Sequence, residues 1–99
     1  MKIAVTYQDG DIFQHFGHTE FFKIYDIENT DIVKTEIVST NGSGHGALAQ
    51  FLHEHSVDTL ICGGIGGGAQ MALSQAGIKL YGGVAGKADD AVNALLNNK

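Results

Sequence analysis

The α/β character of the chain is clearest in residues 59–77, TLICGGIGGGAQMALSQAG. An apolar run at 59–62 precedes a glycine-rich segment, and small apolar residues then recur at helical spacing as far as Ala76. Gly77 follows, and glycine readily takes the left-handed conformation that ends a helix. The stretch therefore predicts a buried strand, a glycine loop and a helix.

On either side of this stretch, the sequence predicts four more strands and two more helices. The segments 20–27 and 32–39 are rich in aromatic and β-branched residues, with Asn29-Thr30 between them as the turn of a hairpin. Apolar residues recur at helical spacing in the other two helices, and Asp89 and Asp90 suit the first turn of the last one. The remaining predicted strands are 2–7 and 78–81, and the helices are 45–55 and 88–96.

This element order, βββαβαβα, predicts one α/β domain over residues 1–99. Two antiparallel connections followed by two right-handed crossovers place the five strands in a mixed sheet. With the strands numbered in chain order, their order across the sheet is near 3-2-1-4-5. Ligands of such sheets bind beyond the carboxyl ends of the parallel strands. We therefore expect four loops to meet at one edge, namely residues 8–19, 40–46, 63–68 and 81–86.

The amino-acid composition of the chain excludes several classes of function. The chain has a net charge of -5, and its six basic residues are all Lys, which argues against nucleic acid as a partner. The single Cys excludes an internal disulfide and a self-contained four-thiolate cluster site. The sequence has neither a membrane-length apolar run nor a signal-peptide pattern, so we expect a cytoplasmic protein with no membrane partner.

The expected loop edge carries most of the residues that could bind a ligand. His15 and His18 lie three apart around Gly17, and His45 belongs to another loop of the same edge. Cys62 has two interpretations: it is a small buried core residue, or the following helix N-terminus lowers its pKa so that it binds metal as a thiolate. His53 and His55 are expected to be surface or packing residues.

The glycine run also has two interpretations. Residues 64–69 match G-x-G-x-x-G/A between a strand and a helix, a context that suits anion binding by backbone N–H groups. A dinucleotide site is not expected, because 99 residues cannot hold both halves of that fold. Alternatively, the glycines only allow a tight turn and close packing of helix against sheet.

Signs of catalysis are few. No nucleophile elbow or zinc-protease motif is present, so we expect a protein that is not an enzyme. An alternative with a divalent metal ion would be a hydrolase that uses carboxylates near the loop edge. The candidate carboxylates are Asp9, Asp11, Glu20 and Asp26.

Three segments together resemble the dinitrogenase iron-molybdenum cofactor biosynthesis family. They are HFGH at 15–18 with the Phe pair at 21–22, CGGIGGGA at 62–69, and GIKLYG at 77–82, and the resemblance extends over residues 1–96. It implies a ribonuclease-H-like sheet and binding of a preassembled metal–sulfur cluster without catalysis. Some members resemble carriers of iron–molybdenum cofactor or its precursor in nitrogen fixation, and others resemble proteins that hold a molybdenum–copper sulfide cluster.

The resemblance also implies residue roles. His18, with His15 beside it, and Cys62 become the candidate metal ligands, and cluster donor and acceptor proteins become the expected partners. Because a cluster brings its own sulfides and negative charge, few protein ligands plus backbone N–H groups are sufficient. A small anion-binding regulatory domain is the alternative function. The residues expected to face the cofactor are Gly17, His45, Gly64, Gly66, Gly67 and Gly68.

Overall fold

The structure is a computed structural model that describes residues 1–42 and 45–97. It is a single α/β domain built on one mixed sheet. The strands are β1 (Lys2–Gln8), β2 (Asp11–Ile12), β3 (Phe21–Glu28), β4 (Asp31–Ser39), β5 (Thr59–Ile61) and β6 (Lys79–Tyr81). The helices are α1 (His45–Glu54), α2 (Gly67–Gln75) and α3 (Ala88–Asn97), and η1 (Phe16–His18) is a short 3₁₀ turn.

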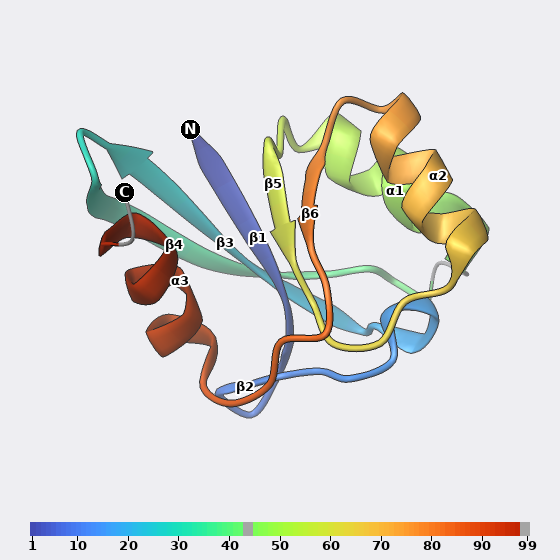
Figure 1. Cartoon of the computed structure of the whole chain (residues 1–99), viewed down its shortest axis with the longest axis horizontal. Coiled ribbons are helices and arrows are strands. Elements are labelled where there is room, and N and C mark those ends of the chain that lie inside the picture. Colours follow the sequence, from blue (N-terminus) through green and yellow to red (C-terminus); the bar gives the residue numbers. More distant parts are fainter. Residues whose placement is uncertain (43–44, 98–99) are drawn as a thin grey trace.

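The main path of the sheet runs β4-β3-β1-β5-β6 (Figure 1). β1 pairs antiparallel with β3 and parallel with β5, and β5 pairs parallel with β6. All five strands of this path occur where the sequence predicts strands. The carboxyl ends of β1, β5 and β6 therefore lie at the same edge. The ribonuclease-H-like classification stays a prediction.

The expectation of five strands was wrong, because β2 adds a sixth. This two-residue strand pairs antiparallel with the end of β1 and lies inside the segment 8–19 that was predicted to be a loop. Asp9 and Gly10 connect β1 to β2 with φ angles of 51° and 92°. Positive φ at both central residues is the conformation of a tight hairpin turn. The cluster of Asp and Gly residues thus reverses the chain where the sequence indicated only a break.

The β3–β4 hairpin agrees with its sequence prediction. Its two linking residues, Asn29 and Thr30, have φ angles of 52° and 70°, which a two-residue hairpin turn requires. A bulge interrupts the register beside Asp26 and Ile27. Of the strands in the described part of the chain, β4 pairs with β3 alone, and most of its residues are exposed.

Helices cover both faces of the sheet and make two hydrophobic cores. In Figure 1, α1 and α2 lie together, and α3 is separated from them by the sheet. Ala4 packs with the residues of α1 and α2, whereas its neighbours Ile3 and Val5 pack with Val92 and Leu96 of α3. This alternation along β1 follows from the two-residue period of a strand and explains why its centre is apolar throughout.

Gly77 ends α2 as predicted. Its φ is +78°, its N–H donates to Ser74 O at 3.0 Å, and Ile78 N–H donates to Leu73 O at 2.9 Å. These two hydrogen bonds are the pair that closes a helix with a left-handed residue just beyond its last turn. The chain is thereby turned directly into β6.

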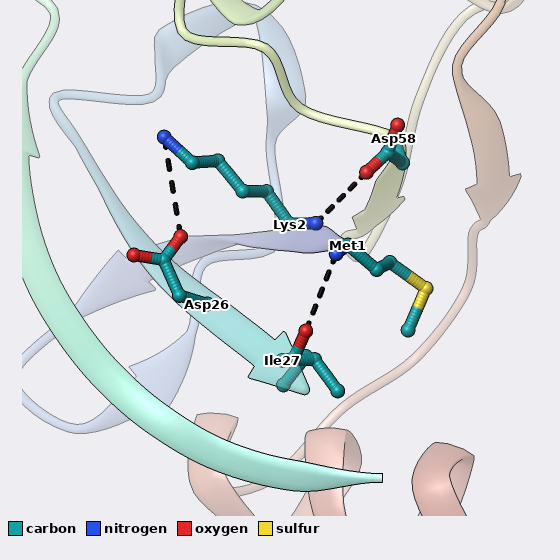
Figure 2. A network of polar contacts seen from close by, with 5 residues as sticks. All are labelled: Met1, Lys2, Asp26, Ile27 and Asp58. Atoms are coloured by element: carbon teal, nitrogen blue, oxygen red, sulfur yellow. Dashed lines mark hydrogen bonds and ion pairs between the residues drawn. The ribbon is translucent and has the colours of Figure 1, made fainter. Parts of the chain in front are cut away.

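A polar network fixes the end of the sheet opposite the loop edge (Figure 2). The backbone N–H of Lys2 donates to Asp58 Oδ2 at 2.8 Å, and Met1 N donates to Ile27 O at 3.2 Å. The Lys2 ammonium lies 3.9 Å from Asp26 Oδ1. Among the described residues, no helix is long and apolar enough to cross a membrane.

Candidate functional site

Two loops from distant parts of the sequence are joined by backbone hydrogen bonds. Gly64 N–H donates to Gln14 O at 2.7 Å, and Phe16 N–H donates to Gly64 O at 3.1 Å. His15 and Gly64 thus form an isolated parallel bridge. The loop after β2, which carries the two candidate histidines, is therefore fixed to the glycine loop after β5.

The loop after β6 joins the same edge. Gly83 N–H donates to Gly63 O at 2.9 Å, and Val84 N–H donates to Cys62 O at 3.0 Å. The Gln14 side chain donates to Val84 O at 3.1 Å and so reaches this third loop. The predicted meeting of the loops after β1, β5 and β6 is found. In the fourth predicted loop, 40–46, residues 43 and 44 lie outside the described residues.

The glycine run divides into two parts with different structural reasons. A Cβ atom on Gly63 would lie 2.7 Å from Gln14 Cα, and one on Gly64 would lie 3.0 Å from Gln14 O. These two glycines are required because the histidine loop passes so close. Among the residues that the structure describes, none beyond the chain neighbours and the backbone of α2 itself places an atom within 4 Å of a hypothetical Cβ on Gly66, Gly67 or Gly68. Packing within the chain therefore explains the first two glycines and leaves the last three unexplained.

The open glycines form the N-terminus of α2. Gly66 is the N-cap residue and has no side chain with which to cap the helix, and no acidic residue occupies the first turn of α2. The first N–H groups of a helix lack partners within the helix, and together with the helix dipole they favour negative charge. The backbone at this end of α2 thus favours an anion, and its first turn carries no negative side chain.

A shallow pocket of about 470 Å³ lies beside the glycine loop. Its wall is formed by two glycine segments, from the loops after β5 and β6, together with a few larger side chains. The lining residues are Gly63, Gly64, Ile65, Gln70, Leu80, Gly82 and Gly83. The backbone is consequently accessible along much of this surface.

The histidine loop is anchored by a buried aromatic ring. Phe16 is buried in the core shared with α1 and α2, and Thr19 Oγ1 donates to Phe16 O at 2.7 Å. Thr40 Oγ1 in turn donates to Thr19 O at 3.0 Å. His15 and His18, on either side of Phe16, are exposed. The loop thus holds both imidazoles in solvent at the same edge as the glycine loop.

The other sequence-predicted residues are placed as follows. Gly17 lies within η1 between the two exposed histidines. His45 is the first residue of α1, a helix that contacts both η1 and α2, and its side chain is outside the part of the chain that the structure describes. His53 is exposed on α1, and His55 Nδ1 lies 2.8 Å from Phe51 O. His53 and His55 thus match the predicted surface and packing roles.

Of the two interpretations of Cys62, the small buried core residue is the one found, and the alternative of a lowered pKa was wrong. The side chain is 0% exposed within the core under α1 and α2, and burial raises the pKa of its thiol to about 11. Its Sγ donates only a weak hydrogen bond to Gly63 O at 3.6 Å. Desolvation of the thiolate is the cause of the raised pKa, because Cys62, the residue after β5, has its side chain in the core. In this conformation Cys62 is a core residue that cannot reach a ligand at the loop edge.

The carboxylates do not assemble into a metal site. Asp11 pairs with Lys87 at 3.0 Å, and Asp26 lies at the opposite end of the sheet beside Lys2. Among residues 1–42 and 45–97, no group of three or more His, Cys, Asp or Glu side chains could hold a metal ion. The hydrolase alternative therefore has no carboxylate cluster in the described part of the chain.

Sequence reasoning missed Gln14 as the residue that joins the loops. Its backbone carbonyl accepts from Gly64, and its side-chain amide donates to Ile12 O at 3.0 Å as well as to Val84 O. Nothing in the sequence marks a glutamine for such a role. The only usable signal was Gly63, since an additional glycine before the G-x-G-x-x-G/A pattern indicates close approach of another segment.

The fold and site define a small α/β domain that presents an exposed histidine loop and an open, uncapped glycine helix N-terminus at one sheet edge. The family model described as "Dinitrogenase iron-molybdenum cofactor" matches residues 1–98, and the chain belongs to this family. The family resemblance noted in the sequence is thereby confirmed.

Individual proteins agree with this assignment. An uncharacterized protein of Methanocaldococcus jannaschii is 30% identical, over 100% of this chain and 88% of its own length. The crystal structure of the protein PH0822 superposes with a TM-score of 0.94 at 29% identity, covering 100% of this chain and 91% of that one. The apo orange protein of Desulfovibrio gigas gives a TM-score of 0.84 at 28% identity, covering 98% and 88% of the two chains.

Proposed function

We propose that this protein binds a preassembled, anionic metal–sulfur cluster at the loop edge and passes it between other proteins without catalysing a reaction. The observation that carries the proposal is the open run Gly66–Gly68. Apart from chain neighbours and the backbone of α2 itself, no atom of the described residues lies within 4 Å of a Cβ at these three positions, so packing against those residues does not require glycine there. Glycine at such positions lets a ligand approach the backbone closely.

The chemistry of the edge suits an anion that carries its own metal ligands. The first N–H groups of α2 and the helix dipole attract negative charge, and a cluster's sulfides accept hydrogen bonds from such groups. The exposed imidazole of His18, with His15 beside it, would supply the protein ligand. Few ligands also make release to an acceptor easier than a closed cage of thiolates would.

Two observations support a molybdenum-containing cargo. The family's description names the iron–molybdenum cofactor, and the orange protein is among the similar structures. We infer that the cargo is iron–molybdenum cofactor, its precursor, or a related molybdenum–sulfur cluster. Its partners would be the proteins that donate and accept that cluster. The net charge of -5 makes nucleic acid a poor partner.

The first test is anaerobic purification from the native host, with a visible absorption spectrum and elemental analysis of the same sample. We expect charge-transfer bands together with molybdenum in a fixed ratio to protein. A colourless, metal-free protein that also takes up neither thiomolybdate nor iron–sulfur clusters in vitro would refute the proposal.

Two pairs of variants locate the binding site. Gly67→Asp places a negative charge in the first turn of α2, where it suits the helix dipole and preserves stability but repels an anion. Asn93→Asp adds the same charge at an exposed position of α3 and serves as the control. His18→Ala removes the proposed ligand, and His53→Ala removes an exposed histidine on α1. Cluster uptake should fall in Gly67→Asp and His18→Ala only.

The uncapped N-terminus of α2 also favours a second candidate, a small anion-binding regulatory domain. This candidate predicts metal-free affinity for a phosphorylated metabolite, measured by calorimetry and lost in Gly67→Asp. It also predicts that His18→Ala leaves that affinity unchanged. Cluster uptake that depends on His18 would favour the carrier function instead.

A further inference from the structure

β4 is an outer strand of the sheet whose free edge remains available for pairing. Within residues 1–42 and 45–97, β3 is the only strand with which it pairs, and seven of its nine residues are exposed. The side chains of Val33 and Ile37 are each 54% exposed, although both are large and apolar. A long strand with exposed apolar residues readily pairs with a strand of another chain.

The backbone groups at the centre of β4 point away from the rest of the molecule. Thr40 N–H donates to Glu20 O at 2.9 Å, so these two directly opposite residues form a hydrogen-bonded pair. Along an antiparallel ladder, hydrogen-bonded and non-hydrogen-bonded pairs alternate. In the register that places Ile37 opposite Lys23 and Thr35 opposite Tyr25, the N–H and C=O of Thr35 and Ile37 therefore face outward.

The order of side chains along β4 is complementary to itself. In the sequence Val33-Lys34-Thr35-Glu36-Ile37, a two-fold axis at Thr35 places Lys34 opposite Glu36 of a second copy and Val33 opposite its Ile37. Antiparallel pairing thus creates two pairs of opposite charge and two apolar pairs at once. Opposite charges directly across two strands stabilise their pairing, whereas like charges destabilise it.

We propose that β4 is a homodimer interface at which two copies of this chain join their sheets edge to edge, antiparallel and centred on Thr35. The occupant of the edge is a second copy because a two-fold axis reverses the strand, and a reversed copy places both Lys34 and Glu36 opposite a residue of the other charge. Lys34 and Glu36 are free for this role, since neither has an ion-pair partner among the side chains that the structure describes.

The proposal is tested by charge reversal, with mass measured by light scattering after gel filtration at low salt. Wild type should have twice the mass of one chain. Lys34→Glu and Glu36→Lys each place like charges opposite one another twice, and each should weaken dimerisation about tenfold or more. The double variant, Lys34→Glu with Glu36→Lys, restores both pairs in reversed order and should dimerise like wild type.

A mixing experiment identifies the register. Lys34→Glu protein carries two acidic residues in the strand centre, and Glu36→Lys protein carries two basic ones, so the two together should form a heterodimer although neither self-associates well. Circular dichroism should show that both variants keep the fold, because both side chains are exposed. A monomeric wild type, a dimer indifferent to either reversal, or a mixture that stays monomeric would overturn the proposal. None of these outcomes depends on cluster binding.

Discussion

The backbone N–H of Gly64 donates a 2.7 Å hydrogen bond to the carbonyl oxygen of Gln14, and this contact joins the histidine loop to the glycine loop. The two residues are fifty positions apart in the sequence. Their approach is so close that Gly63, beside Gly64, has no room for a side chain against Gln14. The geometry of the candidate site therefore depends on two glycines that do not themselves need to touch a ligand.

Gly63→Ala is expected to separate the two loops. The new methyl group would lie 2.7 Å from Gln14 Cα, and a backbone atom cannot move aside cheaply. We expect a loss of about 1–3 kcal/mol in the free energy of unfolding, as for other overpacked sites. Urea unfolding measures this change. The control is Gly68→Ala, which meets open space in the first turn of α2 and should be neutral or stabilising by up to about 1 kcal/mol. Equal losses in both variants would contradict the close-approach explanation.

Cys62 should make the protein less stable at alkaline pH. Its pKa is raised from 9.0 to about 11 by burial, so the folded state keeps the proton after the unfolded chain has lost it. Stability therefore falls as pH rises from about 9 to about 11, by up to about 2 kcal/mol. Chemical denaturation across this range should show a shallower decline for Cys62→Ala than for wild type. The comparison concerns the slope, because the substitution also lowers stability at every pH.

The same burial protects the thiol from modification. At neutral pH, a thiol reagent should label native Cys62 only slowly and should label it fully in urea. Rapid labelling of the native protein would show that the side chain reaches solvent, and it would restore Cys62 as a candidate metal ligand.

Lys23 and Tyr25 should control the ionisation of Asp89. Both donate to Asp89 Oδ1, at 2.8 Å and 2.7 Å, and the hydrogen bond from Lys23 is the larger cause of the lowered pKa of this carboxyl. In Lys23→Met, the pKa of Asp89 should move up toward 3.8, as followed by NMR titration. Tyr25→Phe should raise it less.

The direction of the pH effect follows from the lowered pKa of Asp89. The stabilisation of the folded state by ionised Asp89 is complete above the pKa of 3.8 that this carboxyl has in the unfolded chain. It is lost as pH falls through the lower pKa that Asp89 has in the folded state. Because the Asp89 side chain is 63% exposed, the contribution should stay below about 1 kcal/mol. Acid unfolding of wild type and Lys23→Met should therefore differ slightly above pH 3.8 and converge below it.

Gly77→Ala should destabilise the end of α2. Residue 77 has a φ of +78°, and a side chain in the left-handed region costs about 1–2 kcal/mol. Thermal or urea unfolding measures this loss. Gly46→Ala in α1 provides the matched control, because Gly46 lies inside a helix with open space around it. That substitution should stabilise the protein by up to about 1 kcal/mol. A Gly77→Ala protein as stable as wild type would contradict the left-handed cap.

Much of the fold was predictable because its signals are local. The hairpin turn at Asn29-Thr30, the end of α2 at Gly77 and the acidic first turn of α3 each depend on residues within a few positions of one another. The small strand β2 was missed because two residues carry no periodicity. It forms only because the turn at Asp9-Gly10 brings the chain back against β1.

The site was predictable in position but not in detail. Short loops after parallel strands must meet at one edge, so the order of strands and loops was sufficient to assign the glycine run and the two histidines to it. The pKa of Cys62 could not be assigned, because it depends on the face of β5 to which the thiol turns and on what α1 and α2 place there.

The amino-acid sequence was sufficient to predict the five strands of the main sheet path, the three helices, their order and a glycine-rich helix N-terminus, since periodicity and turn chemistry act over short distances. Only the tertiary structure decided which glycines are needed for packing and which remain open to a ligand. It also decided that Cys62 is a core residue and that Gln14 joins the loops. The physical reason is that burial and close approach depend on segments distant in sequence, whose positions exist only after the sheet has assembled.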